Sequence, residues 1–407
     1  MAQTKITSKS LATNTIAAAN IADNAIESRH LTSTLFSPNI FSDKINVSTG
    51  YFSLPAGTTA QRPTSPPNGS VRFNTDLGVY EWYDSVSTLW LNYGTIRPAY
   101  ATGGTITTIF DPYDGFSYRV HTFTTPGNAS MAFSRSGSVE FLIVGGGGSG
   151  GNHSTTNANG GGGGGGVVYK KNHLVAASTY TVTVGGGAAG LTFQQALNGF
   201  KGGNSSFVGS FTNYIAAGGG GGASTSGNTN GSNENLNGGC GGGSAHDGYR
   251  GGHSNQIKYP DAITYGNSGG KTTVGWTGGG GGGAGSIGSN GGSGAGGDGG
   301  FGISSPISGT VKYYAGGGGG GGNSTEQAGS GWHGGGRGFG AVSRYYTNLN
   351  YPVEINSTTL GGGTPDGIDG TGGGGGGGSY WSNNSTNWLN KGSGSGGDGI
   401  VIIRYRV

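Results

Sequence analysis

The sequence predicts a mainly β protein with much irregular structure: an N-terminal oligomeric shaft, a small β-module, and an antiparallel β-sheet joined to a bundle of polyglycine II-type helices. Three observations lead to this prediction. Apolar residues recur at every fifth position near the N-terminus, strand-like alternation follows as far as Val144, and 98 of the 407 residues are glycine. Ten glycines precede Val144 and 88 follow it, so a change of composition marks the start of the last region.

Residues 1–50 carry the five-residue repeat. Five residues advance a helix by about 500° and alternate faces in a strand, so neither element gathers the repeat on one side. We expect this segment to bury the repeat between identical chains as a homo-oligomeric shaft, with a trimer as the preferred state. A short solenoid within one chain and a flexible arm are the alternatives. The residues expected at the oligomer interface are Ile6, Leu11, Ile16, Ile21, Ile26, Leu31, Phe36 and Phe41.

Residues 51–104 are expected to form a small β-hairpin module. Residues 54–63 are punctuated by proline and should be extended, and strands at 71–74 and 79–83 flank a turn that ends at Gly78. A third strand should include Trp90. The run LPAGTTAQRPTSPPNGSVRFNTDLGVYEWYD resembles a module that is widespread in bacteriophage tail-fibre and appendage proteins, and the repeat before it is similar to the shafts of such proteins.

Residues 105–407 are expected to form a glycine-rich head. Alternating segments at 105–110, 117–123, 130–133 and 138–144 predict an antiparallel sheet. The apolar segment 399–405 should pair with 138–144, so that these two strands bracket the glycine-rich region. Three shorter strand-like pieces lie inside that region, at 166–169, 179–184 and 310–314.

The glycine runs reach seven residues at 160–166, 316–322 and 372–378. Ordering one glycine costs about 1–2 kcal/mol of backbone entropy, and no side chain offsets this cost. A run is therefore ordered only if nearly every N–H and C=O finds a lateral partner, which a bundle of threefold extended helices provides. We expect the longest runs at its centre and the three-residue runs at its periphery. A disordered Gly/Ser linker is the alternative, whereas the missing Gly-X-Y period excludes collagen.

The pattern SGSVEFLIVGGGG … STYTVTVGGG … GGDGIVIIRY resembles the glycine-rich domain of many phage tail proteins. That resemblance implies that loops between glycine runs form a receptor-recognition tip. Aromatic rings beside Asn, Arg and His suit a carbohydrate or protein surface, although the same rings could simply cover the bundle. The candidate receptor-binding residues are Tyr249, His253, Tyr259, Trp276, Trp332, Tyr345, Tyr346, Tyr380, Trp381 and Trp388.

Several motifs resemble phosphate-binding or metal-binding sites but lack the flanking elements or the spacing that such sites need. Residues 266–272 resemble a phosphate-binding loop without its first glycine or its flanking strand and helix. Asp298 and Asp398 stand in a repeated SGxGGDG motif, and we expect them to form turns that accept hydrogen bonds from nearby amides. His246, Asp247 and His253 lack the spacing of metal ligands. We therefore expect no catalytic residue, metal or cofactor, and no enzymatic activity.

Bulk composition limits the partners. The 21 Lys and Arg residues are balanced by 18 Asp and Glu residues and form no basic run, so nucleic acid is not an expected partner. One cysteine cannot form an intrachain disulfide, and neither a signal peptide nor a membrane span is visible. We expect a soluble protein that is made in the host cytoplasm.

The resulting functional expectation is a virion tail-fibre or appendage adhesin. Its partners would be a host cell-surface carbohydrate or outer-membrane protein, together with other virion tail or appendage proteins. A purely structural virion decoration or an extracellular filament subunit is the alternative. An animal receptor ectodomain is disfavoured by the missing signal peptide, membrane span and cysteines.

Overall fold

The computed structural model describes residues 54–92, 98–112, 114–153, 158–192, 195–210, 212–225, 234–245, 250–273, 277–322, 327–340, 365–379 and 392–407. The predicted shaft, including its eight interface residues, lies outside these ranges. The chain divides into two units, Met1–Thr95 and Ile96–Val407. Their described residues form β-structure with almost no helix, and no helix among them is long and apolar enough to cross a membrane.

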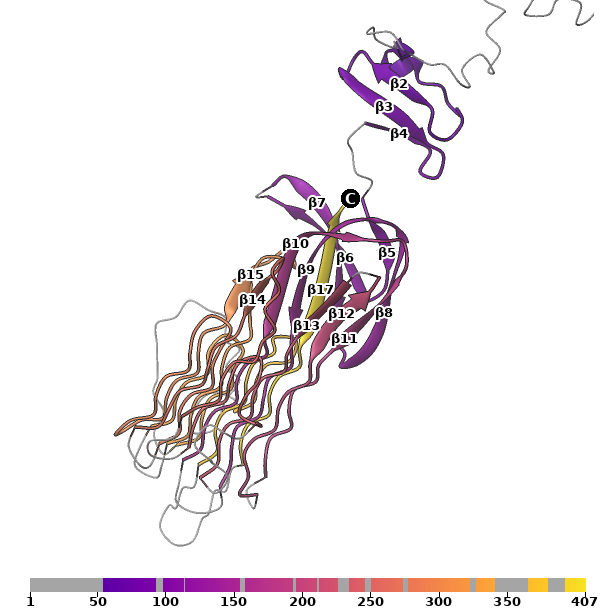
Figure 1. The fold of residues 1–407 in the computed structure, drawn as a ribbon. Coiled ribbons are helices and arrows are strands. Elements are labelled where there is room, and N and C mark those ends of the chain that lie inside the picture. The colour runs from indigo at the N-terminus through magenta and orange to yellow at the C-terminus, as the bar shows by residue number, and fades with distance from the viewer. Residues whose placement is uncertain are drawn as a thin grey trace, which may run out of the picture. The chain divides into compact units, whose positions relative to one another are not determined.

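The first unit contains a four-stranded sheet in the order β1–β2–β3–β4 (Figure 1). The predicted hairpin is confirmed, since Val71 lies opposite Trp82 and Asn74 opposite Val79. The expectation of extended chain over residues 54–63 is wrong in part, because Thr59–Gln61 is a turn of 3-10 helix closed by hydrogen bonds between the Thr58 and Gln61 ends. The strands are β1 Ala56–Gly57, β2 Val71–Asn74, β3 Val79–Asp84 and β4 Leu89–Asn92.

Two sheets of the second unit pack face to face. Within the described residues, one has the order β14–β10–β9–β17–β7–β6 and the other β13–β12–β11–β8–β5, and a separate hairpin joins β15 to β16. The first sheet consists of β6 Thr105–Asp111, β7 Phe116–Phe123, β9 Gly137–Val144, β10 Val167–Val175, β14 Ile263–Tyr265 and β17 Ile400–Arg406. The second consists of β5 Tyr100–Thr102, β8 Gly127–Arg135, β11 Thr179–Val184, β12 Ser205–Gly209 and β13 Thr212–Ala216, and the hairpin of β15 Ile303–Ser305 and β16 Lys312–Tyr314.

The predicted pairing of the two apolar strands is confirmed. β17 lies antiparallel to β9, with Ile400 opposite Val144 and Ile402 opposite Leu142. The expectation of one sheet through residues 105–144 is wrong for β8, which pairs with β11 and β5 in the other sheet. Alternation of polar and apolar residues identifies a buried face but not the sheet to which the strand belongs.

The core between the sheets is rich in aromatic rings. Phe141 of the six-stranded sheet and Phe207 of the five-stranded sheet are fully buried, with ring centroids 5.6 Å apart. Met131 and Tyr180, both completely buried, fill the same layer. These four large side chains belong to strands from both sheets, so the hydrophobic effect holds the sheets together.

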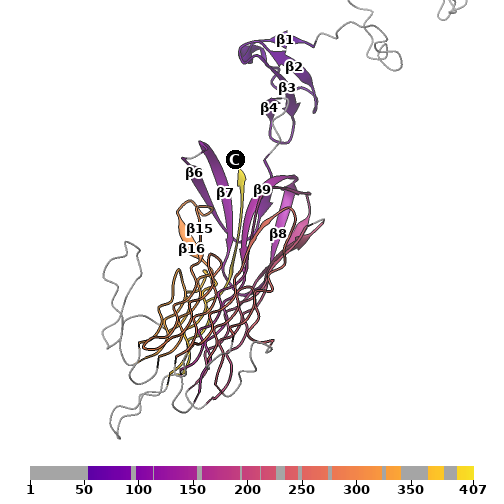
Figure 2. The same cartoon turned by 60° about the vertical axis from the view of Figure 1, so that its left-hand side comes forward.

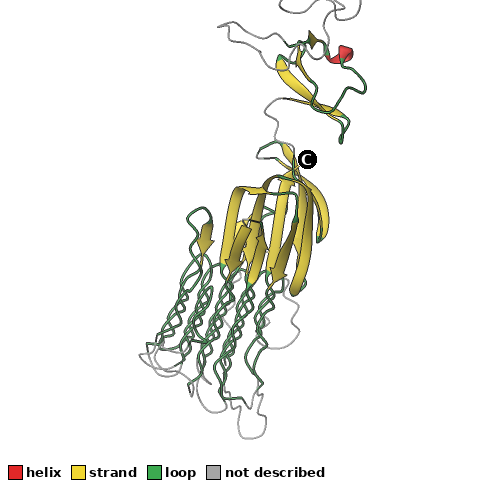
Figure 3. Cartoon of the chain, turned by 45° about the vertical axis from the view of Figure 1, so that its right-hand side comes forward, coloured by secondary structure: helices red, strands yellow, loops and turns green. Residues whose placement is uncertain are grey.

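Strands of this sandwich continue directly into glycine-rich segments. Figure 3 shows the strands at one end of the unit and the extended loops running on from them to the other end. β9 leads into residues 145–151, residues 158–166 lead into β10, and residues 392–399 lead into β17. The sandwich thus fixes the starting position and direction of each of these glycine-rich segments.

Hydrogen bonds between the glycine segments repeat every three residues. Successive amides of residues 145–152 donate to three different segments, which are 160–166, 197–203 and 394–397. Every third amide returns to the same neighbour, as in the bonds from Gly145 to Gly166, Gly148 to Gly163 and Gly151 to Gly160. The backbone groups of one segment are therefore satisfied in three directions rather than in the two of a β-strand.

The longest runs are surrounded on all sides. Residues 159–166 are fully buried, and their amides donate to three segments while their carbonyls accept from three others. Their six neighbours are 372–378, 217–223, 279–282, 145–151, 240–243 and 318–321. The runs 316–322 and 372–378 are likewise buried and have six neighbours each.

The short runs do not all lie at the periphery. Residues 185–187 and 334–336 are partly exposed, as expected, but residues 241–243 are completely buried. That run continues a longer segment through Cys240, whose side chain is also buried, so its three consecutive glycines understate its true length.

Candidate functional site

Several connections between glycine segments start or end beside one group of hydrogen-bonded residues. The group lies at the end of the bundle away from the strands, because Asn159 is separated from β10 by the whole run 160–166 and Gly322 from β16 by the run 316–322. We call these residues the distal anchors. They are Asn159, Ser244, Thr272, Thr277, Gly322, Phe339 and Ser379.

Hydrogen bonds connect the anchors to one another through the ends of the glycine segments. The hydroxyls of Ser244 and Thr272 are 2.8 Å apart, and the Gly322 amide donates to the Phe339 carbonyl at 2.8 Å. The hydroxyl of Ser379 donates to the carbonyl of Gly322, and Nδ2 of Asn159 donates to the carbonyl of Gly378 at 2.9 Å. Segments far apart in sequence therefore end side by side.

The polar anchors are buried although they stand at chain reversals. Asn159, Ser244 and Thr272 have no exposed surface, and Thr277 and Ser379 have almost none. A glycine segment ends with carbonyls that have no further glycine amide to accept from, and short polar side chains supply the missing partner. This explains why Asn, Ser and Thr stand where the glycine runs stop.

Seven of the ten predicted recognition residues lie outside the described ranges. Each belongs to a connection whose neighbouring described residues include a distal anchor: Ser244 before Tyr249, Thr272 and Thr277 around Trp276, Phe339 before the connection with Tyr345 and Tyr346, and Ser379 before the connection with Tyr380, Trp381 and Trp388. The structure thus brings together the points from which these connections depart.

The other three predicted residues lie elsewhere. Tyr259 packs on Tyr214 of β13, with ring centroids 5.0 Å apart, and its hydroxyl accepts a hydrogen bond from the Ile215 amide at 2.9 Å. Trp332 stands at a reversal beside Gly317, at the strand end of the bundle. His253 is exposed and lies midway between the two ends of its segment, where its carbonyl accepts a hydrogen bond from the Gly238 amide. In sequence all three are ring-bearing residues between glycine runs, so no local signal distinguishes them from the other seven.

Around Trp332 lies a second aromatic group that sequence reasoning missed in part. Phe301, 47% exposed, packs against Trp332 with ring centroids 5.2 Å apart. His333 stacks on Tyr313 at 4.1 Å, and its Nδ1 accepts a hydrogen bond from the Gly302 amide at 3.1 Å. Burial lowers the pKa of His333 below its ordinary value. We call Phe301, Tyr313, Trp332 and His333 the proximal aromatic cluster.

A turn at His333 produces this cluster. The backbone φ of His333 is 48°, in the left-handed region that residues other than glycine rarely adopt. Gly334 follows with a φ of 98°. The turn places the imidazole on Tyr313 of β16. A histidine before a glycine is the only sequence signal of such a turn, and it is weak.

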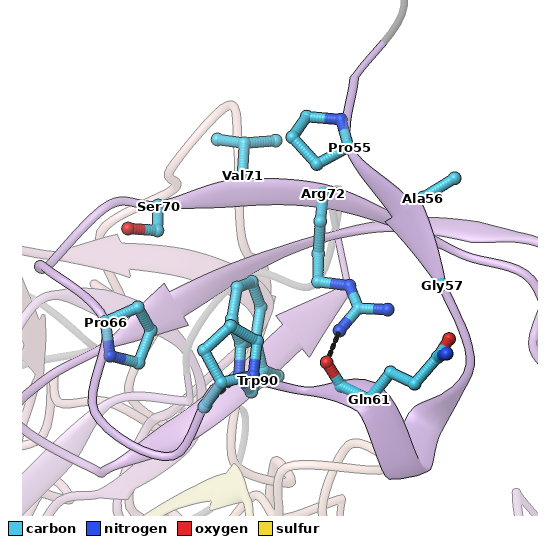
Figure 4. A pocket seen from close by; sticks show the side chains of 10 residues that line it. Pro55, Ala56, Gly57, Gln61, Pro66, Ser70, Val71, Arg72 and Trp90 are labelled. Carbon is cyan, nitrogen blue, oxygen red and sulfur yellow. Dashed lines mark hydrogen bonds between the residues drawn. The ribbon is translucent and has the colours of Figure 1, made fainter. Parts of the chain in front are cut away.

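The first unit carries a groove of about 540 Å³ (Figure 4). Its lining combines the Trp90 indole, three prolines and the Arg72 guanidinium, which donates to the Gln61 carbonyl at 2.8 Å. Beneath it, the fully buried Glu81 pairs with Arg62 at 2.6 Å and Arg72 at 3.4 Å. Burial acts to raise the pKa of Glu81, but hydrogen bonds from Arg62 and Asn74 and the two positive charges lower it overall. The carboxylate holds both arginines in place.

The two repeated aspartates act between segments rather than in turns. Asp298 Oδ1 accepts from the Ser330 amide at 2.7 Å, and Asp398 Oδ1 from the Gly187 amide at 2.8 Å. The expectation that they accept amide hydrogen bonds is confirmed, but the turn assignment is wrong, since their partners lie 32 and 211 residues away. Among the described residues, no group of three His, Cys, Asp or Glu side chains is placed to hold a metal ion.

Comparison with known proteins bears on the second unit. The sequence profile of the glycine-rich domain family matches residues 124–406, which include the strands from β8 to β17 and the glycine segments between them. A comparison with curated proteins finds no significant match.

Proposed function

The chain belongs to the glycine-rich domain family, and we propose that it is a virion tail-fibre or appendage adhesin that attaches the virion to a host cell. The observation that carries the proposal is the convergence of the distal anchors at one end of the bundle. Connections rich in Tyr and Trp leave from this end, and such side chains dominate binding at recognition surfaces. A host carbohydrate or outer-membrane protein would be the partner.

We also propose that the glycine segments are polyglycine II helices. The three-residue hydrogen-bond period and the six neighbours of the central runs support this assignment. A helix with three residues per turn directs successive amides about 120° apart, and without Cβ atoms neighbours can approach from every side. In an adhesin, such a bundle would hold the departing connections in fixed positions, which reduces the entropy lost on binding.

At the other end of the chain, the proposal assigns residues 1–50 to a trimeric shaft that joins other virion tail or appendage proteins. The five-residue apolar repeat supports it, because identical chains wound together would bury the repeat. A shaft of this kind would present three heads at once, and simultaneous attachment of several weak sites raises the overall avidity.

The test measures host-cell binding and stability together. The labelled full-length protein is titrated onto a panel of bacterial strains, and the strain that binds is used for the variants. We expect Trp381→Ala to weaken binding about 5- to 1,000-fold, corresponding to about 1–4 kcal/mol, without changing the thermal midpoint. Trp332→Ala is the matched control, since Trp332 packs against Phe301 at the opposite end of the bundle. It should lower the midpoint and leave binding by the folded protein unchanged.

The outcomes distinguish rings that recognise the host from rings that only cover the bundle. Loss of binding by Trp332→Ala but not by Trp381→Ala would move the recognition surface to the proximal aromatic cluster and overturn the distal site. If the protein bound no strain in a panel that includes its host, attachment would be rejected.

A structural role as a virion decoration or filament subunit is the second candidate function. The observation that favours it is the exposed edge strand β6, which is open to pairing with another copy. A structural subunit would assemble with itself and bind no cells.

A further inference from the structure

Strand β6 is the outer strand of the six-stranded sheet and is largely exposed. Among the described residues it pairs with β7 alone, at the edge of the sheet (Figure 2), and five of its seven residues are exposed. Ile106 and Phe110 stand on the same face of the strand and keep 38% and 64% of their surface in solvent. An edge strand with exposed apolar side chains is a ready template for pairing.

The usual protections of an edge strand are missing from β6. Its sequence, TITTIFD, contains no proline, lysine or arginine, and its one charged residue, Asp111, is paired with Arg404 at 3.2 Å. The register with β7 runs without a bulge from Thr105 opposite Thr122 to Asp111 opposite Phe116. Natural proteins that keep an edge strand unpaired usually place lysine, proline or a bulge there.

We propose that β6 pairs antiparallel with β6 of a second copy of this chain about a two-fold axis through Thr108. Pairing over the full seven residues places Thr108 opposite its own counterpart, Ile106 opposite Phe110, and Thr107 opposite Ile109. Apolar and Thr–Thr pairs across an antiparallel sheet are favourable, and no two like charges face each other. This match between the strand and itself is the reason for choosing a second copy over another partner.

The pairing would join two six-stranded sheets into one continuous sheet. Each head can take only one partner in this way, because the contact uses the whole free edge of β6. Three heads on one shaft therefore cannot all pair with each other, and at least one head of each trimer would be left to pair with a head of another oligomer. This inference does not depend on host attachment.

Disulfide trapping in the full-length protein tests the register. Opposed residues of an antiparallel pair have Cα atoms about 4.5–5.5 Å apart, within the range of a disulfide. We expect Thr108→Cys to form covalent dimers under mild oxidation. Thr105→Cys is the matched control on the same strand, since two copies of residue 105 would be about 20 Å apart. The native Cys240 is fully buried and does not compete.

Charge variants at the same position supply a second test that needs no crosslink. Thr108→Lys and Thr108→Glu place like charges opposite each other, so each variant alone should sediment at a smaller mass than the native protein. An equal mixture should recover the native mass, because lysine then faces glutamate. Equal crosslinking at residues 105 and 108, or variants that sediment as the native protein does, would overturn the proposal.

Discussion

Nε2 of His121 lies 3.0 Å from the hydroxyl of Tyr405, which joins β7 to β17 inside the core of the sandwich. Nδ1 of the same ring lies 2.7 Å from the Gly103 carbonyl and must carry a proton to donate to it. The Tyr405 hydroxyl accepts from the Ala101 amide at 2.9 Å, and its own proton can go to Nε2 at 3.0 Å or to the Ala101 carbonyl at 3.4 Å. A proton on Nε2 would turn the hydroxyl toward the more distant Ala101 carbonyl and would place a positive charge on a fully buried ring, so these surroundings favour the neutral imidazole.

Stability should therefore fall as the pH is lowered from 7.5 to 5. Burial is the main factor that lowers the pKa of His121, and it also lowers that of His173. As the pH falls through about 6.5, the unfolded chain takes up protons on these histidines while the folded protein does not, so unfolding becomes easier. Each histidine contributes a slope of at most about 1.4 kcal/mol per pH unit. Urea unfolding at several pH values measures this slope.

The matched variants isolate the contribution of His121. His121→Gln should reduce the slope, whereas His253→Gln, at an exposed ring, should leave it unchanged. Asp114 and Asp261 have pKa values lowered by hydrogen bonds, from Tyr118 and Lys170 respectively, so their effect begins only below about pH 4. A stability that is constant or rises between pH 7.5 and 5 would contradict the prediction.

Neutralising Glu81 should destabilise the first unit alone. Glu81→Gln keeps the shape of the side chain but leaves Arg62 and Arg72 beside a neutral group in a buried position. We expect a loss of about 2–4 kcal/mol in that unit. Calorimetry should show one shifted transition, while Asp76→Asn, the same charge change at an exposed residue, should have a small effect. A shift in the transition of the second unit would show that the two units do not unfold independently.

Much of the sandwich could be predicted because its strands are distinctive. The sequences of β9 and β17 are too apolar for either face of these strands to be exposed to solvent. Their pairing in the centre of a sheet could therefore be predicted from composition. The hairpin β2–β3 followed from its turn. The placement of β8 did not, because its partner β11 lies more than forty residues further along the chain and alternation does not encode long-range pairing.

The candidate site could be predicted only in outline. Aromatic residues between glycine runs were visible in the sequence, but the end of the bundle at which each connection lies depends on how many times the chain has reversed before it. Trp332 illustrates the difficulty. In sequence both Trp332 and Trp381 follow a glycine run, but the structure places Trp332 at the strand end of the bundle. The left-handed φ of His333, which completes the proximal aromatic cluster, is a local conformation that composition does not reveal.

Cys240 should report the opening of the bundle. Its side chain has no exposed surface, its Sγ lies 3.5 Å from the Gly165 carbonyl, and burial raises the pKa of its thiol to about 12. A thiol reagent such as DTNB should therefore react at least about 100-fold more slowly in native buffer than in denaturant, which corresponds to an opening free energy of about 3 kcal/mol. Leu174→Cys, at a position that is 72% exposed, supplies a reactive control. Rapid labelling of native Cys240 would mean that the bundle opens freely.

A single methyl group should distinguish the centre of the bundle from its surface. A Cβ added at Gly319 would lie 2.1 Å from the Gly329 carbonyl oxygen, and backbone on every side prevents it from turning away. At Gly186 the nearest atom is Cβ of Pro126 at 3.7 Å, an ordinary contact distance. We expect Gly319→Ala to destabilise the second unit by about 1–3 kcal/mol or more, because neighbouring segments must separate.

Gly186→Ala should be neutral or stabilising by up to about 1 kcal/mol, since alanine restricts the unfolded chain. Both variants remove one glycine and add one methyl group, so they change the entropy of the unfolded state alike and differ only in the folded surroundings. Thermal unfolding followed by circular dichroism measures the difference. Equal midpoints for the two variants would mean that residues 316–322 are not packed as the hydrogen bonds to six neighbours require, and Cys240 should then also label rapidly. In a closely packed bundle, the displacement of one segment also displaces the segments hydrogen-bonded to it. We therefore expect Gly319→Ala to accelerate the labelling of Cys240, and Gly186→Ala to leave its labelling rate unchanged.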